Sequence, residues 1–212
     1  QSFLDLEKKI YDAFIERIQS YVPIVQNLCF YLAQLDCLRS FGHLAFTNKY
    51  TCPKLKKSQS LSFKKLRHPV IETQLPSNES YIPNDLHLNK ENQQIIVLTG
   101  PNMSGKSAIL RQTALAVIMA QIGCFVPANE AEIGIVDKIF TRVGASDNIS
   151  QGESTFMVEM LETSSILNNL SSDSLILLDE IGRGTSTYDG ISLAWSIAEY
   201  LHQCAEKPEV LF

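Results

Sequence analysis

The sequence predicts an α/β fold, in which a mainly parallel sheet is flanked by helices and preceded by an α-helical segment. After residue 94, short continuous apolar runs alternate with longer helical patterns, and buried parallel strands have this composition. Residues 1–50 instead repeat apolar side chains every three or four positions, as helices do. We therefore expect a helical segment at residues 1–50 and an α/β domain at residues 51–212.

Composition narrows the class of protein. The 212 residues are 45% hydrophobic and 19% charged, as in soluble globular proteins. No apolar run reaches the roughly 20 residues that span a bilayer, so we expect no membrane partner. The net charge of −5 argues against a strongly basic nucleic-acid surface within this stretch. The chain begins with Gln1 and ends on an apolar run like the start of a strand, so we expect a fragment of a longer protein.

The cysteines point to a reducing, cytoplasmic setting. Five occur, an odd number, and none forms a C-x-x-C pair. A disulfide framework or a zinc site is therefore not expected.

The helical segment carries two apolar sets that Pro23 separates, and we expect the helix to kink or restart there. A helical hairpin packed in a core is the simplest interpretation. The sets are Phe3, Leu6, Ile10, Phe14, Ile18 and Tyr21, then Val25, Leu28, Leu32, Leu35 and Leu38.

Residues 48–94 mix basic residues, short alternating runs and turn residues. The alternation predicts strands around residues 61–63 and at Val70-Ile71. The basic residues between Lys54 and His68 are interpreted as a solvated face, with phosphate or DNA contact as the alternative.

A phosphate-binding motif follows. Residues 95–98 form an apolar, β-branched strand, and a helix is predicted over residues 106–122. Between them the chain reads Gly100-Pro101-Asn102-Met103-Ser104-Gly105-Lys106-Ser107, the pattern G-x-x-x-x-G-K-[ST]. Its glycines let successive N–H groups point into one concavity at a helix N-terminus. Lys106 is expected to reach the β- and γ-phosphates of ATP, and Ser107 to bind Mg²⁺.

Further strands and helices alternate downstream. We expect a strand within residues 133–143, a helix over 154–170, a buried strand over 175–178 and a helix over 191–204. Asp179 follows the buried strand, at the sheet edge where α/β proteins bind ligands, and is expected to hold Mg²⁺. Glu180 comes next and is placed to polarise an attacking water, so the pair favours hydrolysis.

Two polar segments complete the pattern. Residues 150–155, SQGEST, enter a helix and resemble the signature by which one ABC-type subunit covers the γ-phosphate held by another. Residues 182–190, GRGTSTYDG, are interpreted as a loop at the subunit boundary, with a flexible loop and helix cap as the alternative.

Together these motifs resemble the MutS family of DNA mismatch-repair ATPases. The resemblance is carried by GPNMSGKS, RVGASDNISQGESTFMVEM and LLDEIGRGTSTYDGISLAW, with RHPVIE and YIPND ahead of them. It implies a P-loop NTPase of ABC-ATPase type, preceded by the end of the family's lever helices. It also implies ATP turnover coupled to mismatched-DNA recognition and switching to a clamp state.

The resemblance implies roles for single residues. Tyr81 matches the aromatic that stacks on adenine, with Ile82 beside the base and the loop through Ala108 around the phosphates. Asn102 matches a residue that senses nucleotide state. The implied catalytic residues are Glu180, Lys106 and Asn102. Ser154 and Thr155 belong to the signature that acts across a dimer, Arg183 to the interface loop, and Asp147 to a Q-loop-like segment.

The implied partners are mismatched duplex DNA, bound mostly by regions outside this chain, a second MutS-type subunit and a downstream repair factor. A cytoplasmic location is implied, at the nucleoid if the source is bacterial. The family's mismatch-reading, connector and clamp regions, its Thr-His switch and its helix-turn-helix are absent from the sequence, so we expect weak hydrolysis by this chain alone. A recombination paralogue, a non-catalytic ATP-gated dimerisation module and a transporter subunit are the alternatives.

Overall fold

The structure is a computed structural model that describes residues 2–212 except 59, 77, 102–103 and 143–154. The chain divides into two compact units, residues 1–44 and 45–212. Among the described residues, no helix is long and apolar enough to cross a membrane.

The first unit consists of α1 (Phe3–Gln19) and most of α2 (Val22–Asn48). Ser2 caps α1, because its hydroxyl accepts from the Asp5 N–H while the Asp5 carboxylate accepts from the Ser2 N–H. The predicted restart at Pro23 is confirmed, since Pro23 lies in the first turn of α2, where its missing N–H costs nothing. The predicted hairpin in a core is wrong for this chain: neither helix buries a residue.

The second unit begins with a mixed sheet of order β1-β5-β2-β3. β1 pairs parallel with β5, and the other pairs are antiparallel. The buried Leu61 and Phe63 of β2 alternate with the half-buried Ser60 and Ser62, as the sequence predicts around residues 61–63. The strands are β1 (Lys54–Lys56), β5 (Glu130–Gly134), β2 (Ser60–Leu66) and β3 (Asn84–Asn89).

Most of the lysines around β1 and β2 face carboxylates on β5. Lys54 and Lys56 both pair with Glu132, and Lys64 pairs with Glu130 at 2.8 Å. These lysine side chains are exposed, as a solvated face requires. Arg67 and His68, which belong to the same basic set, do not fit that prediction, because Arg67 is half-buried in an ion pair with Glu72 and His68 is buried.

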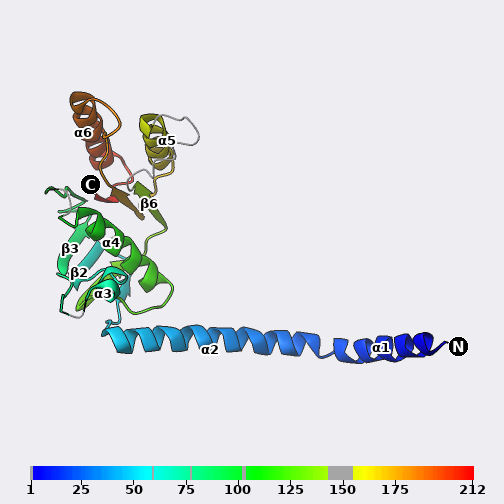
Figure 1. The fold of residues 1–212 in the computed structure, drawn as a ribbon. Helices are drawn as coiled ribbons and strands as arrows, with labels where there is room; N and C mark the ends of the chain where they lie inside the picture. The colour runs from blue at the N-terminus through cyan, green and yellow to red at the C-terminus, as the bar shows by residue number, and fades with distance from the viewer. Residues whose placement is uncertain (1, 59, 77, 102–103, 143–154) are drawn as a thin grey trace. The chain divides into compact units, whose positions relative to one another are not determined.

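The second sheet is entirely parallel, with the order β4-β8-β7-β6. Its edge strand β6 lies next to α5, which spans Thr155–Asn168 (Figure 1). The predicted strand over residues 95–98 is regular only at its first two residues, but the Leu98 N–H still donates to the Phe212 carbonyl at 2.7 Å. The strands are β4 (Ile95–Ile96), β8 (Glu209–Leu211), β7 (Ser174–Leu178) and β6 (Lys138–Arg142).

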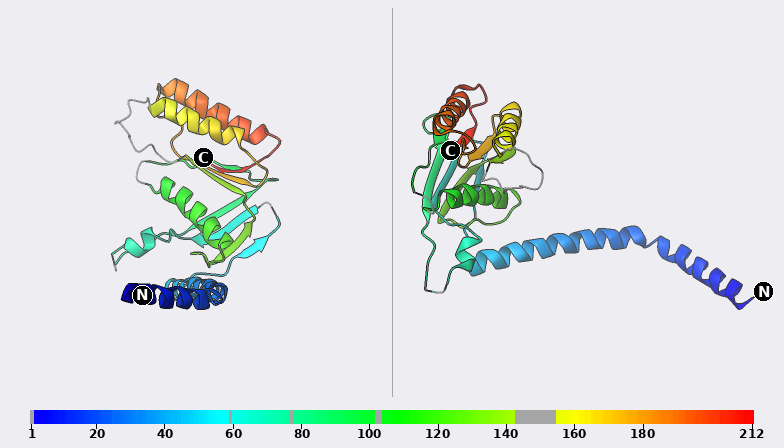
Figure 2. Two further views of the ribbon diagram at one scale, coloured as in Figure 1. Left: turned by 90° about the vertical axis from the view of Figure 1, so that its right-hand side faces the viewer. Right: turned by 45° about the horizontal axis from the view of Figure 1, so that its top comes forward.

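Helices cover both faces of the parallel sheet, as Figure 2 shows. Alternate residues of β7 enter two different cores, because strand side chains alternate between faces. Leu175 and Leu177 pack in the core that α4 and the first sheet share, and Ile176 and Leu178 pack beneath α5 and α6. The helices are α4 (Lys106–Gln121), α5 (Thr155–Asn168) and α6 (Thr187–Gln203).

The α/β prediction is therefore confirmed, with one sheet parallel and the other mixed. α6 begins earlier than predicted, because the Ser186 hydroxyl caps it by accepting from the Asp189 N–H.

The predicted strand at Val70-Ile71 is wrong, because α3 (Ile71–Gln74) occupies that place. The buried His68 explains the helix: its Nδ1 accepts from the N–H groups of Val70 and Ile71, each at 3.3 Å. Burial lowers the pKa of His68, which favours the neutral ring, the form in which Nδ1 can accept.

Candidate functional site

The segment between β4 and α4, residues 100–107, is called the glycine loop below. Gly105 precedes α4 with φ +89°, and Gly100 has φ +155°; residues with a side chain rarely adopt such values. The first N–H groups of α4 therefore open onto the loop, without a side-chain cap. Of the predicted ATP-binding residues here, Asn102 and Met103 lie outside the described residues; those described are Gly100, Pro101, Ser104, Gly105, Lys106, Ser107 and Ala108.

Lys106, the first residue of α4, folds back over the glycine loop. Its Nζ donates to the carbonyl of Gly100 at 2.6 Å and to that of Pro101 at 2.8 Å. An ammonium group has three donors, so one remains for an anion. The loop thus holds a positive charge at a helix N-terminus, which is a setting that favours phosphate.

Asp179 and Glu180 follow β7, whose five residues are all buried. The Asp179 N–H donates to the Arg142 carbonyl at 2.7 Å, which holds Asp179 beside the end of β6. Glu180 has φ +55°, an uncommon value for a residue with a side chain, and its carboxylate pairs with the Arg183 guanidinium.

A cleft of about 250 Å³ brings these parts together. Lys106, Asp179 and Glu180 line it, although more than seventy residues separate the lysine from the carboxylates along the chain. The sequence motifs predict these three residues as one site but do not predict the cleft's apolar wall. That wall is formed by Val97, Leu98, Leu110, Leu178, Ile181 and Phe212.

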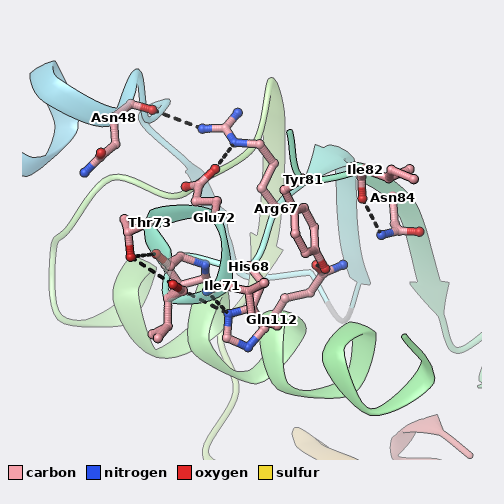
Figure 3. Close-up of polar contacts among 12 residues, drawn as sticks. Asn48, Arg67, His68, Ile71, Glu72, Thr73, Tyr81, Ile82, Asn84 and Gln112 are labelled. Carbon is pink, nitrogen blue, oxygen red and sulfur yellow. Dashed lines mark hydrogen bonds and ion pairs between the residues drawn. The ribbon is translucent and has the colours of Figure 1, made fainter. Parts of the chain in front are cut away.

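Tyr81 lies over the middle of α4 rather than in this cleft. Figure 3 shows its hydroxyl directed at Gln112, and the hydroxyl donates to Gln112 Oε1 at 2.8 Å. Ile82 is 81% exposed, and its carbonyl accepts from the Asn84 side chain at 3.2 Å. The sequence motifs do not predict a role for Gln112, and no local signal marks it, because polar residues, Arg111 and Thr113, flank it in α4.

Next to Tyr81, an ion pair holds the strand end to α3. Arg67 Nε contacts Glu72 at 2.6 Å, and a second guanidinium nitrogen donates to the Asn48 carbonyl (Figure 3). The Arg67 guanidinium also lies over the Tyr50 ring, 5.9 Å from its centroid. Burial, helped by the Glu72 charge, raises the pKa of Tyr50 to about 12. These contacts hold the stretch from Arg67 to Glu72, which precedes Tyr81 in the chain.

The loop after Glu180 packs against the start of α5. The buried Glu159 of α5 accepts the Gly182 N–H, and a Cβ on Gly184 would lie 2.9 Å from the Phe156 Cα. Arg183 therefore lies beside the helix that Thr155 begins. Ser154 and Asp147 lie outside the described residues.

The oxygen ligands available in this site suit a Mg²⁺ ion that is coordinated mainly by the phosphates of a nucleotide. The described residues hold no group of three acidic, histidine or cysteine side chains able to bind a metal. Asp179 and Ser107 would supply a carboxylate and a hydroxyl oxygen. Mg²⁺ commonly binds to one or two such protein ligands together with substrate phosphates and water.

A family model described as MutS domain V matches residues 96–212, which include the cleft and most of its supporting loops.

Relatives extend the likeness to nearly the whole chain. A protein named DNA mismatch repair protein MutS from Christiangramia forsetii is 61% identical over 212 residues, covering 100% of this chain and 24% of that protein. The protein of that name from Flavobacterium psychrophilum is 61% identical over 207 residues, 98% of this chain and 24% of its own. The protein of that name from Cytophaga hutchinsonii is 64% identical over 191 residues, which cover 90% of this chain and 22% of that protein. The chain thus spans about a quarter of the length of these relatives.

Proposed function

Because the chain belongs to the MutS family, we propose that it is the ATP-binding and ATP-hydrolysing domain of a DNA mismatch-repair protein. The observation that supports this most directly is the cleft that Lys106, Asp179 and Glu180 line together. A cation at a helix N-terminus and two carboxylates at the end of a parallel strand are the parts that nucleotide hydrolysis needs.

ATP is the proposed substrate, held as in a P-loop NTPase of ABC-ATPase type. The glycine loop and Ala108 would bind its phosphates through N–H groups and Lys106. Tyr81 would stack on adenine, with Ile82 beside the base, as the family resemblance implies. The half-buried Tyr81 ring and the exposed Ile82 support this assignment.

Mg²⁺ is the proposed cofactor, with Ser107 and Asp179 as its protein ligands. When bound, it would neutralise part of the phosphate charge. Asp179 is almost fully buried beside β6, so its carboxylate is held in place by the sheet rather than by a mobile loop.

Hydrolysis would proceed by attack of water on the γ-phosphorus. Glu180 would take a proton from the water as the new P–O bond forms, and the bond to the ADP oxygen would break. Lys106 would stabilise charge on the phosphate oxygens, and Asn102 would sense the nucleotide. Glu180 pairs with Arg183 through one carboxylate oxygen, Oε2, and the other oxygen would accept from the water.

A second subunit of the same family would complete the site. Ser154 and Thr155, the latter being the first residue of α5, would reach the nucleotide of the partner, while Arg183 and Asp147 would lie near the boundary. The packing of Gly184 on α5 supports a shared movement of the signature helix and the interface loop. ATP turnover would then switch the parent protein between searching for mismatches and a clamp state that recruits a downstream repair factor.

The test is binding of the full-length protein to mismatched and matched duplexes, with and without ATP. We expect tighter binding to the mismatch, weakened by ATP, and loss of that ATP effect in Lys106→Ala. Equal affinity for both duplexes would reject mismatch repair and favour a recombination paralogue. Undiminished ATP affinity in Lys106→Ala would reject the glycine loop as the phosphate site. ATP binding without phosphate release would favour a non-catalytic dimerisation module.

A further inference from the structure

The side chain of Gln112 is polar, yet it is completely buried in α4. Its Oε1 accepts from the Tyr81 hydroxyl, while its Nε2 has no hydrogen-bond partner among the residues the structure describes. Burying an amide with one unsatisfied donor costs stability, and an apolar side chain of similar size would avoid that cost. The bond to Tyr81 is the one polar contact the structure gives this side chain, and it suggests a reason for glutamine at this position.

Tyr81 lies in a segment without regular secondary structure. The chain from Asn78 to Pro83 contains no helix or strand, so backbone pairing does not fix the ring. Burial, together with the Glu72 charge, raises the pKa of Tyr81 above its usual value, which keeps the hydroxyl protonated as a donor. The ring is thus attached at its hydroxyl end to a rigid helix, as Figure 3 shows.

The helix to which Tyr81 is attached is the one that begins at the glycine loop. Gln112 lies six residues beyond Lys106, which is about 9 Å along the helix axis. We propose that Gln112 is a positioning residue for nucleotide binding, which holds the Tyr81 ring so that one helix sets both the adenine platform and the phosphate loop. This inference rests on the proposed function, in which Tyr81 stacks on adenine.

The experiment measures the Kd of the full-length protein for Mg²⁺–ATP and, separately, for inorganic tripolyphosphate, which lacks the base. Gln112→Met removes the acceptor and keeps the length of the side chain. Tyr81→Phe keeps the stacking ring and removes only the hydroxyl. Both variants break the same bond, so each is expected to weaken ATP binding by about three- to tenfold, as loss of one hydrogen bond does. The double variant is expected to be no weaker than either single one, and tripolyphosphate affinity is expected to stay unchanged.

Different results reject different parts of the inference. Equal loss of ATP and tripolyphosphate affinity in Gln112→Met would mean general damage to α4 and would overturn the positioning role. Unchanged ATP affinity in Tyr81→Phe, or additive losses in the double variant, would also overturn it. Tyr81→Ala tests the platform itself: if ATP binding survives that change, the proposed adenine site fails. If Tyr81→Ala abolishes binding while Tyr81→Phe has no effect, only the role of Gln112 fails.

Discussion

The buried carboxylate of Glu159 accepts a hydrogen bond from the backbone N–H of Gly182, three residues beyond Asp179. Glu159 belongs to α5, the helix that Thr155 begins, and Gly182 belongs to the loop that follows Glu180. One hydrogen bond therefore joins the helix proposed to act across the dimer to the loop that carries the proposed base. We expect it to hold Glu180 in position relative to α5.

Replacing Glu159 with alanine should lower ATP turnover more than ATP affinity. The change leaves the Gly182 N–H without its charged acceptor and frees the loop beside Glu180, whereas the glycine loop is untouched. Loss of such a bond should also lower the free energy of unfolding by about 2 kcal/mol. Steady-state phosphate release and ATP Kd measure the first effect, and urea denaturation of the 212-residue chain measures the second.

Glu159→Gln is the matched control, because its amide oxygen can still accept from Gly182. It should recover most of the turnover lost in Glu159→Ala. A glutamine variant as inactive as the alanine variant would mean that the charge, and not the hydrogen bond, is what matters.

Gly182 should not tolerate a side chain. Its φ is +84°, and a Cβ placed on it would lie 2.6 Å from the Cα and carbonyl oxygen of Gly190. Gly182→Ala is therefore expected to destabilise the chain by about 1–3 kcal/mol through backbone strain and displacement of α6. Thermal unfolding measures the change.

Gly42 provides the control for that experiment. It lies within α2, and a Cβ there would meet nothing within 4 Å. Gly42→Ala should leave stability unchanged or raise it by up to about 1 kcal/mol, since alanine favours helix. Equal effects of the two changes would contradict the close approach of Gly182 and Gly190.

The site was more predictable from sequence than the packing around it. Lys106, Asp179 and Glu180 could be grouped because the ends of buried parallel strands meet at one sheet edge. Strand and helix periodicity likewise placed β7 and α4 within one or two residues.

The predictions that were wrong concern features that depend on contacts between residues distant in sequence or on local capping. Nothing in the apolar spacing of Val70-Ile71 reveals that the His68 ring accepts their N–H groups and starts a helix. Periodicity shows that a helix has an apolar face but not what covers it, so the exposure of α1 and α2 was not foreseen.

Glu180→Gln should spare ATP binding and slow hydrolysis. The substitution keeps the size of the side chain but removes the group proposed to take a proton from water, and general-base catalysis is worth about 10²–10⁴-fold. Steady-state turnover of the full-length protein should fall by that order, with the ATP Kd within about twofold of the starting value.

Glu132→Gln serves as the comparison for Glu180→Gln, because Glu132 pairs with Lys54 and Lys56 on the first sheet, away from the cleft. Turnover should be unchanged in this variant. Full activity of Glu180→Gln would remove Glu180 as the base and would require another group to take the proton from water.

Glu209, at the start of β8, should make stability depend on pH. Its side chain is buried opposite Leu175, and burial raises its pKa to about 7, although the Lys90 charge lowers it in part and Asp173 raises it slightly. Between about pH 4.5 and 7 the folded chain therefore holds a proton that the unfolded chain has released. The resulting contribution to stability is complete below about pH 4.5 and is lost as pH rises through about 7.

Glu209→Gln should remove this dependence, because the amide mimics the protonated carboxyl group at every pH. The variant should gain about 2–3 kcal/mol over the parent chain at pH 8 and little at pH 4.5, as judged by urea denaturation across that range. We expect no change in ATP affinity, because Glu209 does not line the cleft. It begins β8, whereas the cleft residue Phe212 follows the other end of that strand. Parallel pH profiles for the two proteins would show that Glu209 titrates alike in the folded and unfolded chains, contrary to its burial.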